Sequence, residues 1–257
     1  MKRRMLLGAM AAGSLSGCIG ELDGFLGEDE PDCPEAYDQI DFEPVEDVDE
    51  AILGGPECPR GTPVHPVYGD SFPSFSVPDA LTEETIESHE LYDDSPLVMT
   101  FIFTNCPDRC PELMGILQII QDDAITEGWD DDVTLAAMTW DPERDGADEL
   151  RDYGEVHGID VDHEQFHLLR PETNEEAIDL VDDTLGVPAQ HGDHDHDHDD
   201  HEHDDHDDHG AGDAHYYMIF IVNTDGIVER SYPGPILWHR SPDDISQAVS
   251  TVVNNDA

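Results

Sequence analysis

The chain has 257 residues and carries 63 Asp and Glu against 10 Lys and Arg, a formal net charge of −53. Such a surface repels a phosphate backbone, which excludes a nucleic-acid-binding protein that works through basic residues. Apolar residues make up 37% of the chain and are grouped in runs, enough for one core of ordinary domain size. Because a compact domain at this charge repels itself unless salt screens it, the composition indicates an extreme halophile.

The first 17 residues have the pattern of an export signal. A basic head at residues 2–4 precedes a weakly apolar run at 5–15, shorter than the ~20 residues that span a bilayer. Leu15-Ser16-Gly17-Cys18 is similar to a lipobox, and the Arg pair in the head to a twin-arginine signal. We expect residues 1–17 to be a lipoprotein signal peptide, with lipidated Cys18 anchoring the protein to the outer face of the cell membrane. An ordinary cleaved signal with a chance cysteine is the alternative.

Residues 18–68 are rich in Asp, Glu, Gly and Pro and have no sustained apolar period. This composition predicts a disordered, acidic, flexible tether. The segment contains Cys33 and Cys58, each followed by Pro. Outside the cell such a pair more often forms a structural disulfide than a metal site, so we expect a disulfide here.

From residue 69 to residue 257, strand-length apolar runs alternate with segments of helical period. This order predicts an α/β domain with a mixed central sheet flanked by helices, and a thioredoxin-like fold fits it. An Asp-Gly turn at 225–226 predicts that the last two strands form a hairpin. In chain order, the predicted elements are a strand at Leu97–Phe103, a helix at Leu113–Ala124, a strand at Val133–Thr139, a helix at Ala147–His157 closed by Gly158, a strand at Phe166–Leu169, a helix at Asn174–Leu185 stopped by Gly186, strands at Tyr217–Val222 and Ile227–Tyr232, and a helix at Pro242–Val253.

Two cysteines lie where the first buried strand passes into the first long helix. Cys106 and Cys110 flank Pro107-Asp108-Arg109, and the amides of a helix's first turn together with its dipole favour a thiolate. A lowered pKa is therefore predicted for at least Cys106. One helical turn apart, the two side chains should lie on one face about 5–6 Å apart at Cβ, within reach of a shared soft metal ion or of each other. Spacing alone leaves both uses open, with a static disulfide or two inert thiols as the structural alternative.

The residues around the cysteines resemble the SCO/SenC family, copper-handling thioredoxin-like proteins that assemble the copper centre of cytochrome oxidase. The resemblance covers roughly residues 70–253. It implies that Cys106, Cys110 and His215 are the copper ligands, and that the partner is the copper-site subunit of cytochrome c oxidase. The matching segments are Phe103–Pro111, Asp141–Asp145, Phe166–Leu169, and His215 with Phe220–Gly226.

Three features differ from the family pattern. Tyr216 follows His215 where a serine is common, and Val222-Asn223-Thr224 replaces the usual tripeptide before the Asp-Gly turn. The third is an insertion at residues 191–214, where the tract 191–209 holds eight of the chain's 15 His. No core can be built from it, so we expect a disordered loop whose imidazoles capture Cu(II), Zn(II) or Ni(II). An acidic loop whose histidines bind nothing is the alternative.

These observations favour a copper chaperone that binds Cu(I) through two cysteines and one histidine and delivers it to the oxidase. The first alternative is a thiol-disulfide oxidoreductase acting on the oxidase copper-site subunit, with Cys106 as attacking thiolate and Cys110 as resolving thiol. A metal-capturing solute-binding lipoprotein and a peroxidase fit less well. Asp108 and Asp141 are candidates for orienting the ligands, with surface solvation as the competing interpretation. The six isolated histidines are assigned no chemistry: His65, His89, His157, His163, His167 and His239.

Overall fold

The computed structural model describes residues 48–56, 63–106, 108–190, 214–215 and 217–256. Its strands are β1 Ser76–Pro78, β2 Thr85–Glu87, β3 Leu97–Ile102, β4 Thr134–Thr139, β5 Phe166–Leu169, β6 Ala189–Gln190, β7 Ala214–His215, β8 Met218–Val222 and β9 Val228–Pro233. Its helices are α1 Cys110–Glu127, α2 Ala147–Val156, α3 Asn174–Ile178, α4 Gly234–Leu237 and α5 Pro242–Asn255.

The central sheet has five strands in the order β5-β4-β3-β8-β9. β3, β4 and β5 run parallel, and β8 and β9 are antiparallel to their neighbours. β3 and β4 are buried along their whole length, as continuous apolar runs of this kind predict. The loops that follow β3, β4 and β5 therefore lie at one edge of the sheet. Because β8 is antiparallel to β3, the residues that precede β8 reach that same edge.

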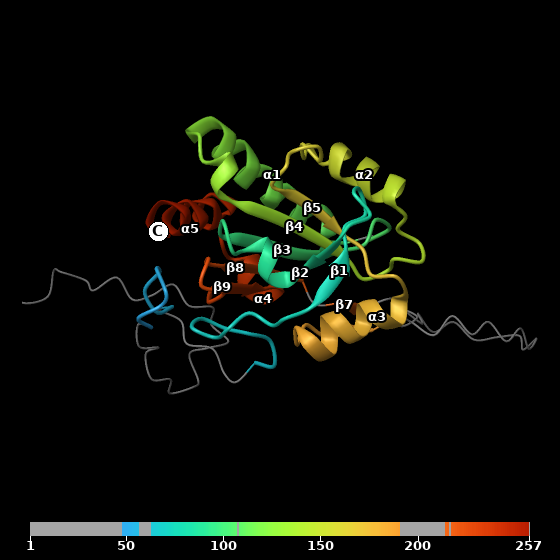
Figure 1. Cartoon of the computed structure of the whole chain (residues 1–257), viewed down its shortest axis with the longest axis horizontal. Helices are drawn as coiled ribbons and strands as arrows, with labels where there is room; N and C mark the ends of the chain where they lie inside the picture. Colours follow the sequence, from blue (N-terminus) through green and yellow to red (C-terminus); the bar gives the residue numbers. More distant parts are fainter. Residues whose placement is uncertain (1–47, 57–62, 107, 191–213, 216, 257) are drawn as a thin grey trace, which may run out of the picture. The chain divides into compact units, whose positions relative to one another are not determined.

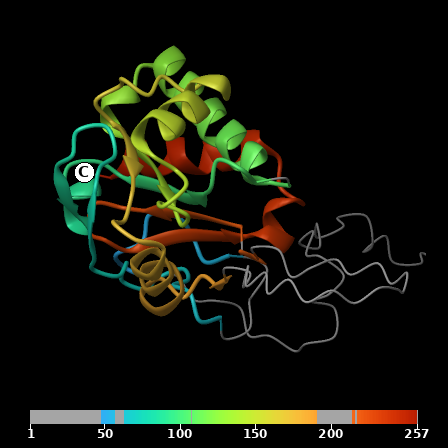
Figure 2. The ribbon, with the colours of Figure 1, turned by 90° about the vertical axis from the view of Figure 1, so that its right-hand side faces the viewer.

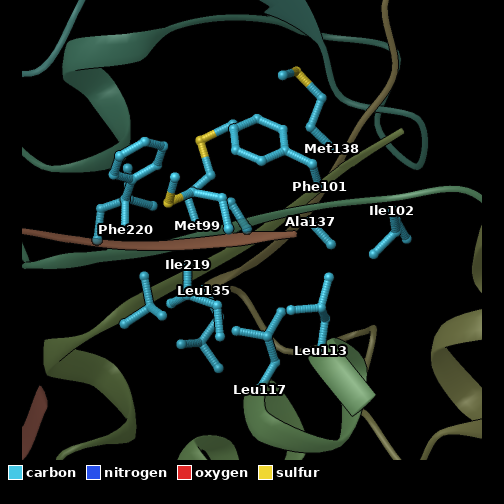
Figure 3. Close-up of a cluster of buried hydrophobic side chains, with 14 of the residues drawn as sticks. Met99, Phe101, Ile102, Leu113, Leu117, Leu135, Ala137, Met138, Ile219 and Phe220 are labelled. Carbon is cyan, nitrogen blue, oxygen red and sulfur yellow. The ribbon is translucent and has the colours of Figure 1, made fainter. Parts of the chain in front are cut away.

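Helices cover both faces of the central sheet, with α1, α2 and α5 on one face and α3 on the other (Figures 1 and 2). α1 and α5 are joined by a hydrogen bond from the Ser246 hydroxyl to Asp123 (2.6 Å). Figure 3 shows Leu113 and Leu117 of α1 facing Ile219 of the sheet, while Phe101 points to the opposite face. The alternation of side chains along buried strands thus supplies a core to both helical layers.

The predicted α/β order and thioredoxin-like arrangement are confirmed. All five predicted strands and all four predicted helices are present, with boundaries shifted by a few residues. The third predicted helix is shorter as an α-helix and continues as a π-helical turn at Asp179–Thr184. Gly186 follows it at φ +64°, and a Cβ there would meet the Val64 carbonyl oxygen at 2.3 Å. Only glycine allows this approach, so the turn fixes how segment 63–66 packs.

Parts of the predicted tether 18–68 are described, and these parts contact the domain. The amides of Ile52 and Leu53 donate to the buried Glu229 carboxylate at 2.7 and 2.8 Å. The amide of Val48 donates to the Tyr68 hydroxyl at 3.1 Å. These contacts tie the segment to strand β9 and the residues just before the domain.

Several sequence predictions fall outside the described residues. They concern the signal peptide and Cys18, the Cys33–Cys58 disulfide, the histidine tract 191–209 and Tyr216. Of the helices in the described part of the chain, none combines the length and apolar character needed to cross a membrane.

Candidate metal centre

The cysteine loop connects the end of β3 to the start of α1. Cys110 is the first residue of α1 and is fully buried, whereas Cys106 in the loop is half-buried. Both residues carry thiols, and the backbone amide of Cys110 lies 3.5 Å from the Cys106 sulfur. A backbone amide this close to a sulfur is typical of the first turn of a helix. The contact joins Cys106 in the loop to Cys110 at the first position of α1.

The two thiols differ in their acidity. The pKa of Cys110 is raised far above its ordinary value, first by its hydrogen bond with Cys106 and then by burial, with a smaller contribution from the charge of Asp145. The lowered pKa predicted for at least Cys106 therefore does not extend to Cys110. The hydrogen bond with Cys106 and burial both favour the protonated form, so protons compete strongly for the Cys110 sulfur unless a cation replaces them.

Asp145 ties the base of the cysteine loop to the loop after β4, and it is fully buried. Its carboxylate accepts the Thr104 amide at 3.0 Å, the Thr104 hydroxyl at 2.5 Å and the Thr139 hydroxyl at 2.6 Å. Arg170, just after β5, donates to the backbone oxygens of Asp145 and Pro142 at 2.8 and 2.6 Å. Burial raises the pKa of Asp145, while its hydrogen bonds with Thr104 and Thr139 oppose that rise. The loops after three strands are thus locked together beside the cysteines.

Sequence reasoning missed the role of Asp145. It named Asp108 and Asp141 as candidates for orienting the ligands, with surface solvation as the competing interpretation. In the structure the Asp141 carboxylate accepts the Asn174 side-chain amide at 3.0 Å and pairs with Arg144 at 3.3 Å. The available signal was the pairing of a buried aspartate with threonines at the ends of two neighbouring strands, which becomes visible only once the strand order is known.

His215 lies at the same edge of the sheet as the cysteines. It ends β7, three residues before β8 begins, and its backbone pairs with Ala189 of β6. The first residues of β8 adjoin the carboxyl end of β3, because Ile219 pairs with Thr100 and the Met218 carbonyl accepts the Thr100 hydroxyl at 2.8 Å. The chain therefore passes the cysteine loop directly after His215.

Tyr217 connects this segment to the cysteine loop. Its hydroxyl donates to Asp108, between the two cysteines, at 3.1 Å. Its ring packs edge-on against Trp238 with the ring centroids 5.5 Å apart, and the Arg109 guanidinium lies 4.8 Å from the Trp238 centroid. Burial raises the pKa of Tyr217, followed by the charge of Cys106 and the hydrogen bond to Asp108. These contacts form one wall of the site, which we call the aromatic wall (Tyr217 and Trp238).

The altered tripeptide Val222-Asn223-Thr224 makes hydrogen bonds of its own at the Asp-Gly turn. The Asn223 side-chain oxygen accepts the amides of Asp225 and Ile227 at 3.2 and 3.0 Å, which closes the Asp-Gly turn. Its amide nitrogen donates to buried Glu229 at 2.6 Å. The altered tripeptide therefore supplies the turn with its own hydrogen bonds.

Two of the histidines that were assigned no chemistry serve as structural partners. His167 contacts buried Asp79 at 3.1 Å. The Nε2 of His163 lies 3.2 Å from Asp130, and Asp131 is close enough for these three groups to surround one ion. However, the His163 Nδ1 accepts the Gln165 amide at 3.2 Å, so in the neutral ring the proton sits on Nε2 and blocks it as a ligand.

Comparison with solved structures identifies similar folds. A SCO1/SenC family lipoprotein from Bacillus anthracis aligns with a TM-score of 0.56 at 18% identity, covering 74% of this chain and 99% of its own. Yeast Sco1 with copper bound aligns with a TM-score of 0.54 at 16% identity, covering 75% and 91%. BsSco, described as a member of the Sco family of cytochrome c oxidase assembly proteins, aligns with a TM-score of 0.51 at 18% identity, covering 76% and 98%.

At these identities the structural likeness shows the fold. None of the curated proteins compared with the chain matches it. The SCO1/SenC family model matches residues 73–254, almost the whole folded region, and the chain therefore belongs to the SCO1/SenC family.

Proposed function

We propose that this protein binds Cu(I) through Cys106, Cys110 and His215 and delivers it to the copper-site subunit of cytochrome c oxidase. The observation that carries the proposal is the meeting of the cysteine loop and the His215 segment at one edge of the sheet, joined by the Tyr217–Asp108 hydrogen bond. Two thiolates and one imidazole are a soft donor set suited to Cu(I). Copper is the cargo in this proposal, and no substrate bond is broken.

The acidity of the site supports a cation as its occupant. Cys110 holds its proton strongly, first because of its hydrogen bond with Cys106 and then because it is buried, and the charge of Asp145 adds a smaller effect. A monovalent cation that takes the place of this proton keeps one positive charge beside the thiolate and the nearby carboxylate. Copper binding should therefore release protons, and affinity should rise with pH over the range in which these thiols ionise.

The test is Cu(I) affinity of the reduced chain, measured by competition with a colorimetric Cu(I) chelator. Cys106→Ser, Cys110→Ser and His215→Ala are compared with the unmodified chain, each with and without residues 191–209, so that spare imidazoles cannot replace His215. His89→Ala is the matched control, because His89 is exposed and its only described ion pair is a 3.9 Å contact with Asp93. Equal affinity in the unmodified chain and in Cys106→Ser would refute the proposal.

A thiol-disulfide oxidoreductase is the second candidate function. It is favoured by the asymmetry of the pair, since half-buried Cys106 is accessible for attack while buried Cys110 has a raised pKa suited to a resolving thiol. An oxidase-assembly assay separates the two functions. Full activity of His215→Ala without the tract, together with loss of activity in Cys106→Ser, would favour the reductase.

We also propose that the protein is exported and held on the outer face of the membrane by a lipid on Cys18. The supporting observations are the lipobox-like sequence and the lipoprotein among its structural relatives. Mass spectrometry of the membrane fraction tests this, since Cys18→Ser should abolish the lipid adduct.

The tract 191–209 is proposed to hold weaker Cu(II) or Zn(II) sites that disappear when it is deleted and fade below about pH 6, where imidazoles are protonated.

A further inference from the structure

We propose that Tyr217 is a positioning residue of the copper site. Through its hydrogen bond to Asp108 it holds the cysteine loop against the segment that carries His215. This inference rests on the proposed function, because it concerns how firmly the two ligand-bearing segments are kept together before copper arrives. Tyr217 is not itself a ligand in this proposal.

The hydrogen bond bridges two segments that are far apart in sequence. Asp108 lies between Cys106 and Cys110, and Tyr217 lies two residues after His215. The Asp108 carboxylate is mostly exposed, with 65% of its side-chain surface accessible, so it would point freely into solvent without this partner and Arg109. A bond from a tyrosine to such a carboxylate restricts the cysteine loop at its midpoint.

The Tyr217 end of the bridge is fixed to the domain. The Gly234 amide donates to the Tyr217 carbonyl at 2.8 Å, at the corner between β9 and α4. A Cβ on Gly234 would lie 3.5 Å from the Tyr217 ring and 3.4 Å from Trp238 Nε1, so the aromatic wall packs directly on this backbone. The tyrosine hydroxyl is therefore presented from a rigid base.

Arg109 makes a second contact from the same loop to the aromatic wall. Its guanidinium lies 4.8 Å from the Trp238 centroid, while Trp238 packs edge-on against Tyr217. Two consecutive residues of the loop thus contact the aromatic wall: Asp108 contacts Tyr217 and Arg109 contacts Trp238. Arg109 also pairs with Glu112 at 2.9 Å in the first turn of α1, which orients its side chain.

Holding the loop in place before binding should strengthen binding. When three ligands come from two separate segments, the site loses conformational entropy on closing around the metal, and contacts that already join the segments reduce that loss. Loss of the one hydrogen bond should weaken Cu(I) binding about two- to tenfold, the range for a typical intramolecular hydrogen bond. Tyr217→Phe removes this bond and keeps the ring on Trp238.

The experiment is a double-mutant cycle on the reduced full chain. Cu(I) affinities of Tyr217→Phe, Asp108→Ala and the double variant are measured by chelator competition, with Cys106→Ser defining binding away from the cysteines. Tyr68→Phe is the matched control, because the Tyr68 hydroxyl likewise makes one hydrogen bond, accepting the Val48 amide. Tyr68 lies at the end of the sheet opposite the cysteines, since the amide of the next residue, Gly69, donates to the Val228 carbonyl there. Thermal midpoints are recorded for every variant to detect a general loss of structure.

The proposal expects Tyr217→Phe to weaken Cu(I) binding while its thermal midpoint falls no further than that of Tyr68→Phe, which also loses one hydrogen bond. Tyr68→Phe should leave Cu(I) binding unchanged. Tyr217→Phe should have no further effect on binding once Asp108 is alanine. If Tyr217→Phe binds like the unmodified chain, or weakens binding equally in the Asp108→Ala background, the inference is overturned and the proposed function stands. If the unmodified chain binds no better than Cys106→Ser, the proposed function fails and this inference with it.

Discussion

Replacing Asp145 by alanine should strongly destabilise the domain. The change removes the acceptor of three hydrogen bonds and leaves the Thr104 amide and two threonine hydroxyls without it in a fully buried position. Each buried donor left unsatisfied costs about 1–3 kcal/mol, and removal of a buried charge returns part of that cost. We therefore expect a net loss of about 3–5 kcal/mol, where the low end assumes that water reaches one threonine.

Thermal unfolding followed by circular dichroism in molar salt measures this loss. For a domain of this size, each kcal/mol shifts the midpoint by about 2–4 °C, so Asp145→Ala should melt about 6–20 °C lower. Asp145→Asn keeps an acceptor oxygen and should lose about 1–2 kcal/mol. Asp152→Ala, an exposed acidic residue of α2, is the control and should change little. An Asp145→Ala midpoint within about 2 °C of the unmodified chain would refute the stabilising role of the Asp145 hydrogen bonds.

Other predictions follow from the remaining buried carboxylates and the total charge. Burial alone raises the pKa of Asp79, but hydrogen bonds from His167, Thr82 and Leu81 outweigh it and lower the pKa. The ionised Asp79 carboxylate therefore stabilises the fold fully above the pKa of an unfolded aspartate, about 3.9, and this contribution is lost as the pH falls through the lower pKa of the folded state. The free energy of unfolding of Asp79→Asn, measured by urea titration, should accordingly fall less with acidification than that of the unmodified chain. Glu229→Gln replaces one of the two carboxylate oxygens that accept the Ile52 and Leu53 amides with an NH2 group, which cannot accept a hydrogen bond. Amide hydrogen exchange at Ile52 and Leu53 should therefore become faster. Dialysis from molar to dilute salt should lower the thermal midpoint, and an unchanged midpoint would contradict the halophile hypothesis.

The main sheet could be predicted from the sequence because its strands are buried on both faces. Runs such as Leu97–Ile102 and Thr134–Thr139 are continuously apolar or small, and the stripe of α1 has a clear helical period. The minor strands β1, β2, β6 and β7 have only two or three residues, too few to show any period. Their existence depends on what they pair with, which local sequence does not encode.

The sequence indicated candidate ligand residues for the site, but not the residues that hold the cysteine loop in place. The cysteine spacing and the family motif pointed to Cys106, Cys110 and His215, and these remain predicted ligands. The supports could not be predicted, since Asp145 is 41 residues from Thr104 and Tyr217 is 109 residues from Asp108. Among the 63 acidic residues of the chain, the sequence alone does not distinguish a structural carboxylate from one that only solvates the surface.

Burial makes that distinction. Among the described residues, four carboxylates are buried: Asp79, Asp141, Asp145 and Glu229. Each of them joins segments distant in the chain: Asp79 contacts β5, Asp141 contacts α3, Asp145 joins two loops, and Glu229 receives residues 52–53. A buried carboxylate without donors is costly, so each position demands its partners and thereby specifies which segments meet. Exposed carboxylates impose no such demand. Under the halophile hypothesis the many exposed acids set the salt concentration that folding requires, whereas the four buried acids specify which distant segments of the domain meet.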